Sequence, residues 1–403
     1  MAAALERASR HVHQLELGPD TREASDLHIK VALDGATNWV LIGGPPCQAY
    51  SLVGRSRRAN DLTFEDDKKH FLYQEYLHII RKFSPAVFVM ENVKGLLSST
   101  HGGQPMFARI RDDLRNEGGD AEYVIYSLTV PDEPDNLVPR DFIIRSEEYG
   151  VPQQRHRVIL LGVRSDVGRK PTILQKREKQ ATVREAIGHL PAIRSRISRG
   201  NDAVDLWANV RSLAHRMAKD SVDGFAEPLR PVPPLGQEFV RGRDTPVDTE
   251  LQRWLSDHAI GGFANHVSRG HMEADLYRYF FAAAFGAVNF RSPLLSEFAT
   301  DLLPNHNAAR LESKAFADRF KVQIWDKPSS TVVSHIAKDG HYYIHPDPSQ
   351  MRSLTVREAA RLQTFPDNYA FLGNRTQQYT QIGNAVPPYL AYQIGNIVSE
   401  LLN

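Results

Sequence analysis

Cys47 has the most distinctive chemistry in this sequence, because it is the only cysteine among 403 residues. It stands in the stretch GGPPCQAYS at residues 43–51, which follows a short apolar run at residues 39–42. The run predicts a buried strand, and the glycines and prolines predict a rigid turn at its end. Cys47 is therefore expected just beyond the carboxyl end of a strand, where open α/β sheets bind their ligands. Without a disulfide partner, it serves either as a nucleophile or, as is commoner for a lone cysteine, as a small buried apolar side chain.

Four further motifs contain side chains that can take part in chemistry. In chain order they are ENV at residues 91–93, QQRHR at 153–157, RSLTVREAARLQTFP at 352–366 and QIGNAVPP at 381–388. Together with the cysteine stretch, these motifs resemble those of the DNA (cytosine-5)-methyltransferases, and they occur in the family's order. The resemblance covers roughly residues 36–164 and 325–403, and it favours the nucleophilic role for Cys47.

The resemblance implies an enzyme that uses S-adenosylmethionine to methylate carbon 5 of cytosine at a specific sequence in duplex DNA, in a restriction-modification or epigenetic context. Carbon 5 is a poor nucleophile, and addition of a thiolate at carbon 6 turns the ring into an enamine that can accept a methyl group. Cys47 is the expected nucleophile, and Glu91 is expected to stabilise the charge that develops at ring N3. Arg155 is expected to favour the thiolate or to hold the cytosine O2. Arg157 is a further catalytic candidate, and either arginine could instead be a surface charge.

The same resemblance implies contacts with the cofactor and with the DNA. Because the target atom lies inside the base stack, the cytosine must be flipped out of the duplex. Pro46, Asn384 and Val386 are the expected cofactor-binding residues, although the last motif could simply shape a turn. No metal is expected, because the pair His266 and His271 lacks an evident third ligand.

The apolar runs predict an α/β fold. Strands alternate with helices over the first part of the chain, which indicates a largely parallel sheet covered on both faces. The resemblance implies that this is the Rossmann-like sheet of S-adenosylmethionine methyltransferases. We predict the first part of a catalytic domain over residues 1–165 and a smaller, irregular target-recognition domain over residues 166–324. Residues 325–403 are expected to return to the catalytic domain and to end in a helix.

One motif of the family has no counterpart before Cys47. The family begins with a strand and an F-x-G-x-G loop that contacts S-adenosylmethionine, but only 46 residues precede the cysteine. The sheet is therefore expected to be N-terminally incomplete, through a misassigned start codon, a truncation, or a separate polypeptide that supplies the missing cofactor loop. The alternative functions are a catalytically incomplete DNA-binding fragment and one subunit of a split methyltransferase, with RNA as a less favoured substrate.

Composition sets wider limits. Hydrophobic residues make up 41% and charged residues 24% of the chain, which is ordinary for a globular protein. The formal net charge is +1, so any basic surface that binds DNA must be local. No apolar run approaches the roughly 20 residues that span a bilayer, and no signal peptide is evident. The resemblance implies double-stranded DNA as the partner. No membrane is expected, and the expected location is the cytoplasm, with the nucleoid.

Overall fold

The computed structural model describes residues 6, 8–9, 11–45, 73–101, 104–116, 121–198, 202–242, 247–303 and 318–403. The chain forms two compact units. Unit 1 consists of Met1–Arg145, His156–Gln175 and Gln393–Asn403, and unit 2 consists of Ser146–Arg155 and Lys176–Tyr392. The segment that carries the predicted arginines therefore passes from unit 2 to unit 1 between Arg155 and His156.

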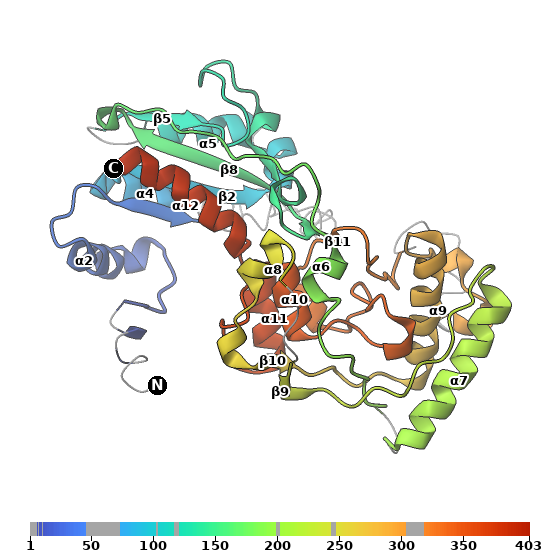
Figure 1. Ribbon diagram of the computed structural model, residues 1–403. Coiled ribbons are helices and arrows are strands. Elements are labelled where there is room, and N and C mark those ends of the chain that lie inside the picture. The colour runs from blue at the N-terminus through green and yellow to red at the C-terminus, as the bar shows by residue number, and fades with distance from the viewer. Residues whose placement is uncertain are drawn as a thin grey trace. The chain divides into compact units, whose positions relative to one another are not determined.

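Unit 1 is built on a five-stranded sheet with the order β1-β2-β8-β5, in which β6 also pairs with β8 (Figure 1). Residues 158–163 of β8 are buried without interruption, as is typical of a central strand covered on both faces. The strands of the sheet are β1 Val40–Gly43, β2 Val87–Val93, β5 Tyr123–Tyr126, β6 Ile143–Arg145 and β8 His156–Arg164.

The sheet is mixed rather than wholly parallel. β1 and β2 are the only neighbouring strands of this described sheet that pair parallel, because β8 runs antiparallel to β2, β5 and β6. The other four strands therefore share one direction, and the departure from the predicted parallel sheet is the single strand β8. A parallel neighbour requires a crossover connection, usually a helix. The chain between β5 and β8, all of it described, contains only short 3-10 turns and short strands. The sequence could not reveal this, because an apolar run looks the same in either strand direction.

The helices of unit 1 pack on this sheet through apolar side chains. In α4, Tyr73–Phe83, Tyr76 and Ile80 lie one helical turn apart and face the core that contains Phe88 and Leu160. Ser84 ends this helix in a left-handed conformation, just before a proline that disfavours continuation. The other elements are η1 Pro19–Thr21, α2 Arg22–Leu33, η4 Lys94–Ser98, β3 Thr100–His101, β4 Gln104–Pro105, α5 Met106–Asn116, η5 Pro139–Phe142 and η7 Ser165–Val167.

Unit 2 has two hydrophobic cores. In the first, α7 Val204–Ser221 and α9 Glu273–Asn289 pack around the fully buried Trp207. The second gathers α6 Val183–Ile187, α8 Glu250–Leu255, α10 Val356–Leu362 and α11 Arg375–Asn384. The remaining elements are η6 Ser146–Tyr149, β7 Gln153–Gln154, β9 Gln237–Arg241, η8 His258–Ile260, β10 Gly262–His266, η9 Leu295–Glu297, η10 Thr300–Leu302, β11 Ser329–Ser330, η12 Ser334–Ala337 and η13 Pro348–Gln350.

The last helix, α12 Pro388–Leu402, belongs to both units, because unit 1 begins again at Gln393. In unit 1, Glu400 accepts hydrogen bonds from Arg169 and Thr172, which follow β8. Residues 325–392 belong to the same compact unit as residues 176–324. The assignment of residues 166–324 to target recognition stays a prediction. No helix in the described part of the chain is both long enough and apolar enough to cross a membrane.

Candidate active site

The structure brings Glu91 and Arg157 together. In the antiparallel pairing of β2 with β8, Val93 lies opposite Arg157 and Glu91 lies opposite Ile159. Glu91 and Arg157 are therefore diagonal neighbours on one face of the sheet, within reach of each other. The Nε atom of Arg157 lies 2.8 Å from Oε1 of Glu91.

This ion pair is half-buried rather than sealed. The side chains of Arg157 and Glu91 retain 19% and 21% of their exposure, respectively. Burial lowers the pKa of the Arg157 guanidinium, and the neighbouring carboxylate of Glu91 partly offsets that effect. Because each side chain of the pair keeps a partly exposed face, both can form hydrogen bonds with a ligand in addition to the one that joins them.

The turn after β1 lies beside this pair. Because β1 and β2 run parallel, their carboxyl ends meet at the same edge of the sheet. The side chain of Asn92 donates to the carbonyl of Pro45 at 3.4 Å. A Cβ atom added to Gly44 would lie 3.2 Å from Oε2 of Glu91, so glycine allows the backbone to approach the carboxylate closely. Pro46 and Cys47, which come next, lie outside the described residues.

Arg155 lies in a different environment from Arg157. It is 3% exposed, belongs to unit 2, and its Nη1 atom donates to the carbonyls of Val332 and Gly383 at 3.2 Å each. In a continuous strand, residues two positions apart face the same side. β7 ends at Gln154 and β8 begins at His156, so Arg155 falls between two strands. Within unit 1 the structure thus brings Arg157 to Glu91, whereas Arg155 belongs to unit 2. A role for Arg155 at the reacting ring stays a prediction.

Asn384 and Val386 lie where α11 gives way to α12. Asn384 is the last residue of α11; its side chain is exposed and makes no hydrogen bond with another described residue. Val386 is half-buried in the short link before α12. An amide that can both donate and accept, next to an apolar side chain, fits a ligand with an amino group, a carboxylate and an apolar chain. These are the groups of the methionine part of S-adenosylmethionine.

Two glutamines that the motifs gave no role lie in the interior of unit 2. Gln153 and Gln363 are both fully buried and hydrogen-bond to each other. The only signal in the sequence was their position inside two of the motifs, because a separation of 210 residues hides their contact.

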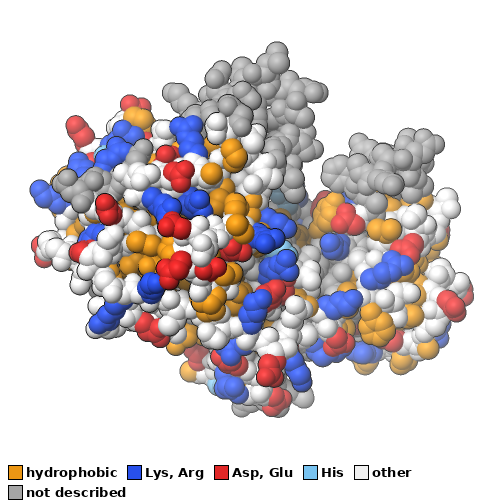
Figure 2. All heavy atoms as spheres, turned by 90° about the horizontal axis from the view of Figure 1, so that it is seen from above, with side chains coloured by type: hydrophobic (Ala, Val, Ile, Leu, Met, Phe, Trp, Pro, Cys, Tyr) orange, Lys and Arg blue, Asp and Glu red, His pale blue; other side chains and the backbone are white. Residues whose placement is uncertain are grey.

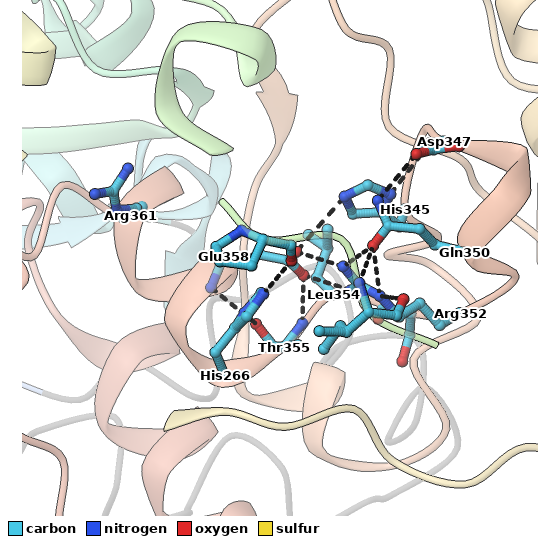
Figure 3. Close-up of polar contacts among 12 residues, drawn as sticks. His266, His345, Asp347, Gln350, Arg352, Leu354, Thr355, Glu358 and Arg361 are labelled. Carbon is cyan, nitrogen blue, oxygen red and sulfur yellow. Dashed lines mark hydrogen bonds and ion pairs between the residues drawn. The ribbon is translucent and has the colours of Figure 1, made fainter. Parts of the chain in front are cut away.

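The motif at residues 352–366 forms a buried polar network (Figure 3). Glu358 accepts from both terminal nitrogens of Arg352, at 2.7 and 2.6 Å. Thr355 caps α10, and His266 contacts its hydroxyl at 3.1 Å. The network joins the strand β10 to helix α10 and therefore holds the framework of unit 2 together. Among the described residues, no group of three or more His, Cys, Asp or Glu side chains could hold a metal ion.

Comparisons with known proteins agree with one another. A family model described as C-5 cytosine-specific DNA methylase matches residues 25–400. The chain is 36% identical over 368 residues to the type II methyltransferase M.Bpa9945I of Bacillus paralicheniformis, covering 90% of this chain and 71% of that protein. It is 30% identical over 408 residues to the type II methyltransferase M.AgeI of Thalassovita gelatinovora, covering 90% of this chain and 83% of that protein.

One solved structure, described as a DNA modification methyltransferase encoded within an Escherichia coli prophage, matches with a TM-score of 0.57. It shares 18% identity, and the match covers 93% of this chain and 82% of that one. At this identity the likeness shows the fold, which is the Rossmann-like α/β fold of DNA methyltransferases.

Proposed function

Because the chain belongs to the C-5 cytosine-specific DNA methylase family, we propose that it methylates carbon 5 of cytosine at a specific sequence in duplex DNA, with S-adenosylmethionine as the methyl donor. The observation that carries the proposal is the half-buried Glu91–Arg157 pair beside the turn that leads to Cys47. As its relatives are named type II methyltransferases, we place the activity in restriction-modification, and hence with the DNA in the cytoplasm.

The proposed reaction begins with the flipped cytosine against the ion pair. The thiolate of Cys47, which follows Pro45 by two positions, adds to carbon 6. Glu91 faces ring N3 and shares a proton with it, so that the charge displaced by the addition is stabilised. Arg157 holds the Glu91 carboxylate in place and donates its remaining N–H groups to the cytosine O2. After methyl transfer, a base removes the proton from carbon 5, the released electron pair restores the double bond between carbons 5 and 6, and the bond from carbon 6 to the sulfur of Cys47 breaks.

The residues assigned to the methyl donor fit its chemistry. S-adenosylmethionine, when bound, supplies an electrophilic methyl group. In the proposal, the amide of Asn384 binds the polar end of its methionine part, and Val386 and Pro46 contact its apolar part. The amide of Asn384 is exposed and bonds to no other residue in the described part of the chain. This supports the assignment, because a surface Asn that only shapes a turn would bond to nearby backbone.

Residues 166–324 are proposed to read the DNA sequence. On the face drawn in Figure 2, Lys and Arg side chains are interspersed with Asp and Glu side chains, in keeping with the net charge of +1. Binding to phosphates must therefore depend on a limited number of local basic contacts, and it should weaken with rising salt.

Neither the comparisons nor the described residues support a separate polypeptide that supplies a cofactor loop.

The decisive experiment traps the covalent adduct. Purified protein is incubated with labelled S-adenosylmethionine and mixed-sequence DNA, and label in 5-methylcytosine is measured. In parallel, DNA with 5-fluorocytosine at the methylated site is used, because fluorine cannot leave as the carbon 5 proton does. We expect a stable protein–DNA adduct that Cys47→Ala abolishes while DNA binding remains. DNA binding without methyl transfer by the unaltered chain would instead support the catalytically incomplete alternative.

A further inference from the structure

Three buried side chains in unit 2 hold the backbone on both sides of Asn384. They come from two motifs far apart in the sequence, because Gln153 and Arg155 precede β8, whereas Gln363 follows α10. All three are at most 3% exposed. Their hydrogen bonds end on the carbonyls of Gly383 and Ala385, the two residues that flank Asn384.

The two glutamines form one chain of hydrogen bonds. The side-chain nitrogen of Gln153 donates to the carbonyl of Leu362 at 3.1 Å and to the side-chain oxygen of Gln363 at 2.6 Å. Gln363 in turn donates to the carbonyl of Ala385 at 2.6 Å. The side-chain oxygen of Gln153 accepts from the backbone nitrogen of Val332 at 2.8 Å, so both amides are engaged at both ends.

The other side of Asn384 is fixed by Arg155 and by close packing. Arg155 donates to the carbonyl of Gly383, and the same nitrogen donates to the carbonyl of Val332. A Cβ atom added to Gly383 would collide with the backbone where Val333 meets Ser334. The segment is therefore held at the carbonyls before and after Asn384, while the Asn384 side chain itself remains exposed.

We propose that Gln153, Gln363 and Arg155 are positioning residues that set the affinity for the methyl donor by fixing the backbone on either side of Asn384. The inference rests on the proposed function, in which Asn384 binds the methionine part of S-adenosylmethionine. It gives Arg155 a role different from that of Arg157, which pairs with Glu91. Pre-organisation of this kind raises affinity because the ligand need not order the segment when it binds.

The test compares two buried glutamines in the same unit. Gln363→Met removes the bond to Ala385 at nearly constant volume. Gln323→Met is the matched control, because Gln323 is also buried and bonds to Tyr342 and Ser330 rather than to the segment at Asn384. The readouts are the Kd for S-adenosylhomocysteine by calorimetry, the KM values for S-adenosylmethionine and DNA, and kcat at saturation.

We expect Gln363→Met to raise the Kd for S-adenosylhomocysteine and the KM for S-adenosylmethionine about 2- to 10-fold, the usual worth of one hydrogen bond. The KM for DNA and kcat at saturation should change less than about 2-fold, and Gln323→Met should leave the cofactor constants unaltered. Gln153→Met combined with Gln363→Met should weaken binding no more than either alone, since both interrupt one chain of bonds. If the fold-changes of the two single variants multiplied in the double variant, the two glutamines would act independently and not as one chain of bonds.

Arg155→Lys tests whether Arg155 positions the segment at Asn384 or acts at the cytosine. The lysine keeps the charge but cannot reproduce the geometry of the guanidinium, so binding of S-adenosylhomocysteine should weaken as in Gln363→Met. If its affinity stayed normal and only kcat fell, Arg155 would act at the reacting ring and the inference would be wrong for it. Gln363→Asn, one methylene shorter, replaces Gln363→Met if the latter does not fold.

Measurements on the unaltered chain distinguish failure of the proposed function from failure of the positioning role alone. If it bound no S-adenosylhomocysteine and transferred no methyl group, the proposed function and the inference would both fall. If it bound and methylated normally, and Gln363→Met matched Gln323→Met in cofactor affinity, the inference alone would fall.

Discussion

Glu358→Gln should destabilise unit 2 strongly, because Glu358 neutralises a buried guanidinium. Both Glu358 and Arg352 are 1% exposed, and the carboxylate accepts two hydrogen bonds from Arg352 and one from the backbone nitrogen of Thr355. A glutamine keeps the shape but presents an NH₂ group to a guanidinium that has only donors. The substitution thus leaves one donor facing another and a positive charge without its counter-ion.

The magnitude follows from what remains around Arg352. Removal of one partner of a buried pair costs about 3–5 kcal/mol. The guanidinium would still donate to the side-chain oxygen of Gln350 and to the carbonyls of Ile193 and Ser353. These contacts solvate part of its charge, so we expect a loss near the lower limit, about 3 kcal/mol. This is a large part of the 5–15 kcal/mol that stabilises a typical domain.

Urea unfolding followed by tryptophan fluorescence measures this loss. Three of the four tryptophans, Trp207, Trp254 and Trp325, belong to unit 2, so the signal reports mainly on that unit. Asp326→Asn is the matched control, because it breaks an ion pair with Arg184 in which both side chains are more than half exposed. Exposed pairs contribute little to stability.

A loss below about 1 kcal/mol for Glu358→Gln, comparable with the control, would show that Glu358 is not the required counter-ion of Arg352. The double replacement Arg352→Met with Glu358→Met provides an independent check. Removing both charges should be less harmful than removing one, because no unpaired charge remains buried.

Three other perturbations should alter catalysis, cofactor binding and stability in acid. Glu91→Gln should slow methyl transfer on the order of 100-fold or more at saturating DNA while leaving DNA affinity nearly intact; a normal single-turnover rate would contradict its role at N3. Gly383→Ala should weaken S-adenosylhomocysteine binding in calorimetry, because a Cβ would displace the backbone at Ser334; unchanged affinity would show that the segment tolerates displacement. Acid should destabilise unit 2. Burial, and secondarily the Arg352 charge, lowers the pKa of His345 to about 4. Burial raises the pKa of the Glu358 carboxyl, but the nearby charges, chiefly that of Arg352, lower it by more, so this pKa lies below its usual value. Both pKa values are lower in the folded state, so the unfolded chain binds more protons. The free energy of unfolding should therefore decrease as the pH is lowered below about 6.5. An unfolding midpoint in urea that stayed constant between pH 7 and pH 4.5 would contradict this.

The local parts of the site could be predicted from the amino-acid sequence. The apolar runs predict the strands that end near Gly44 and Glu91 and a strand at residues 158–163, since burial on a sheet requires these residue types. In the structure that last strand begins two residues earlier, at His156, and so includes Arg157. The capping box at the start of α6, formed by Thr182 and Glu185, is also a local feature, because both partners lie within one helical turn. Motif order, which is also local information, indicated the family.

How these parts combine depends on the folded chain. An apolar run does not encode strand direction, and the sheet proved mixed because β8 returns antiparallel between β2 and β5. Arg155 and Arg157 are two positions apart in one motif, yet the break between β7 and β8 sends them to different units and different partners. The bond between Gln153 and Gln363 joins residues 210 positions apart. Such contacts depend on which surfaces meet when the chain folds, and no periodicity in the sequence records that choice.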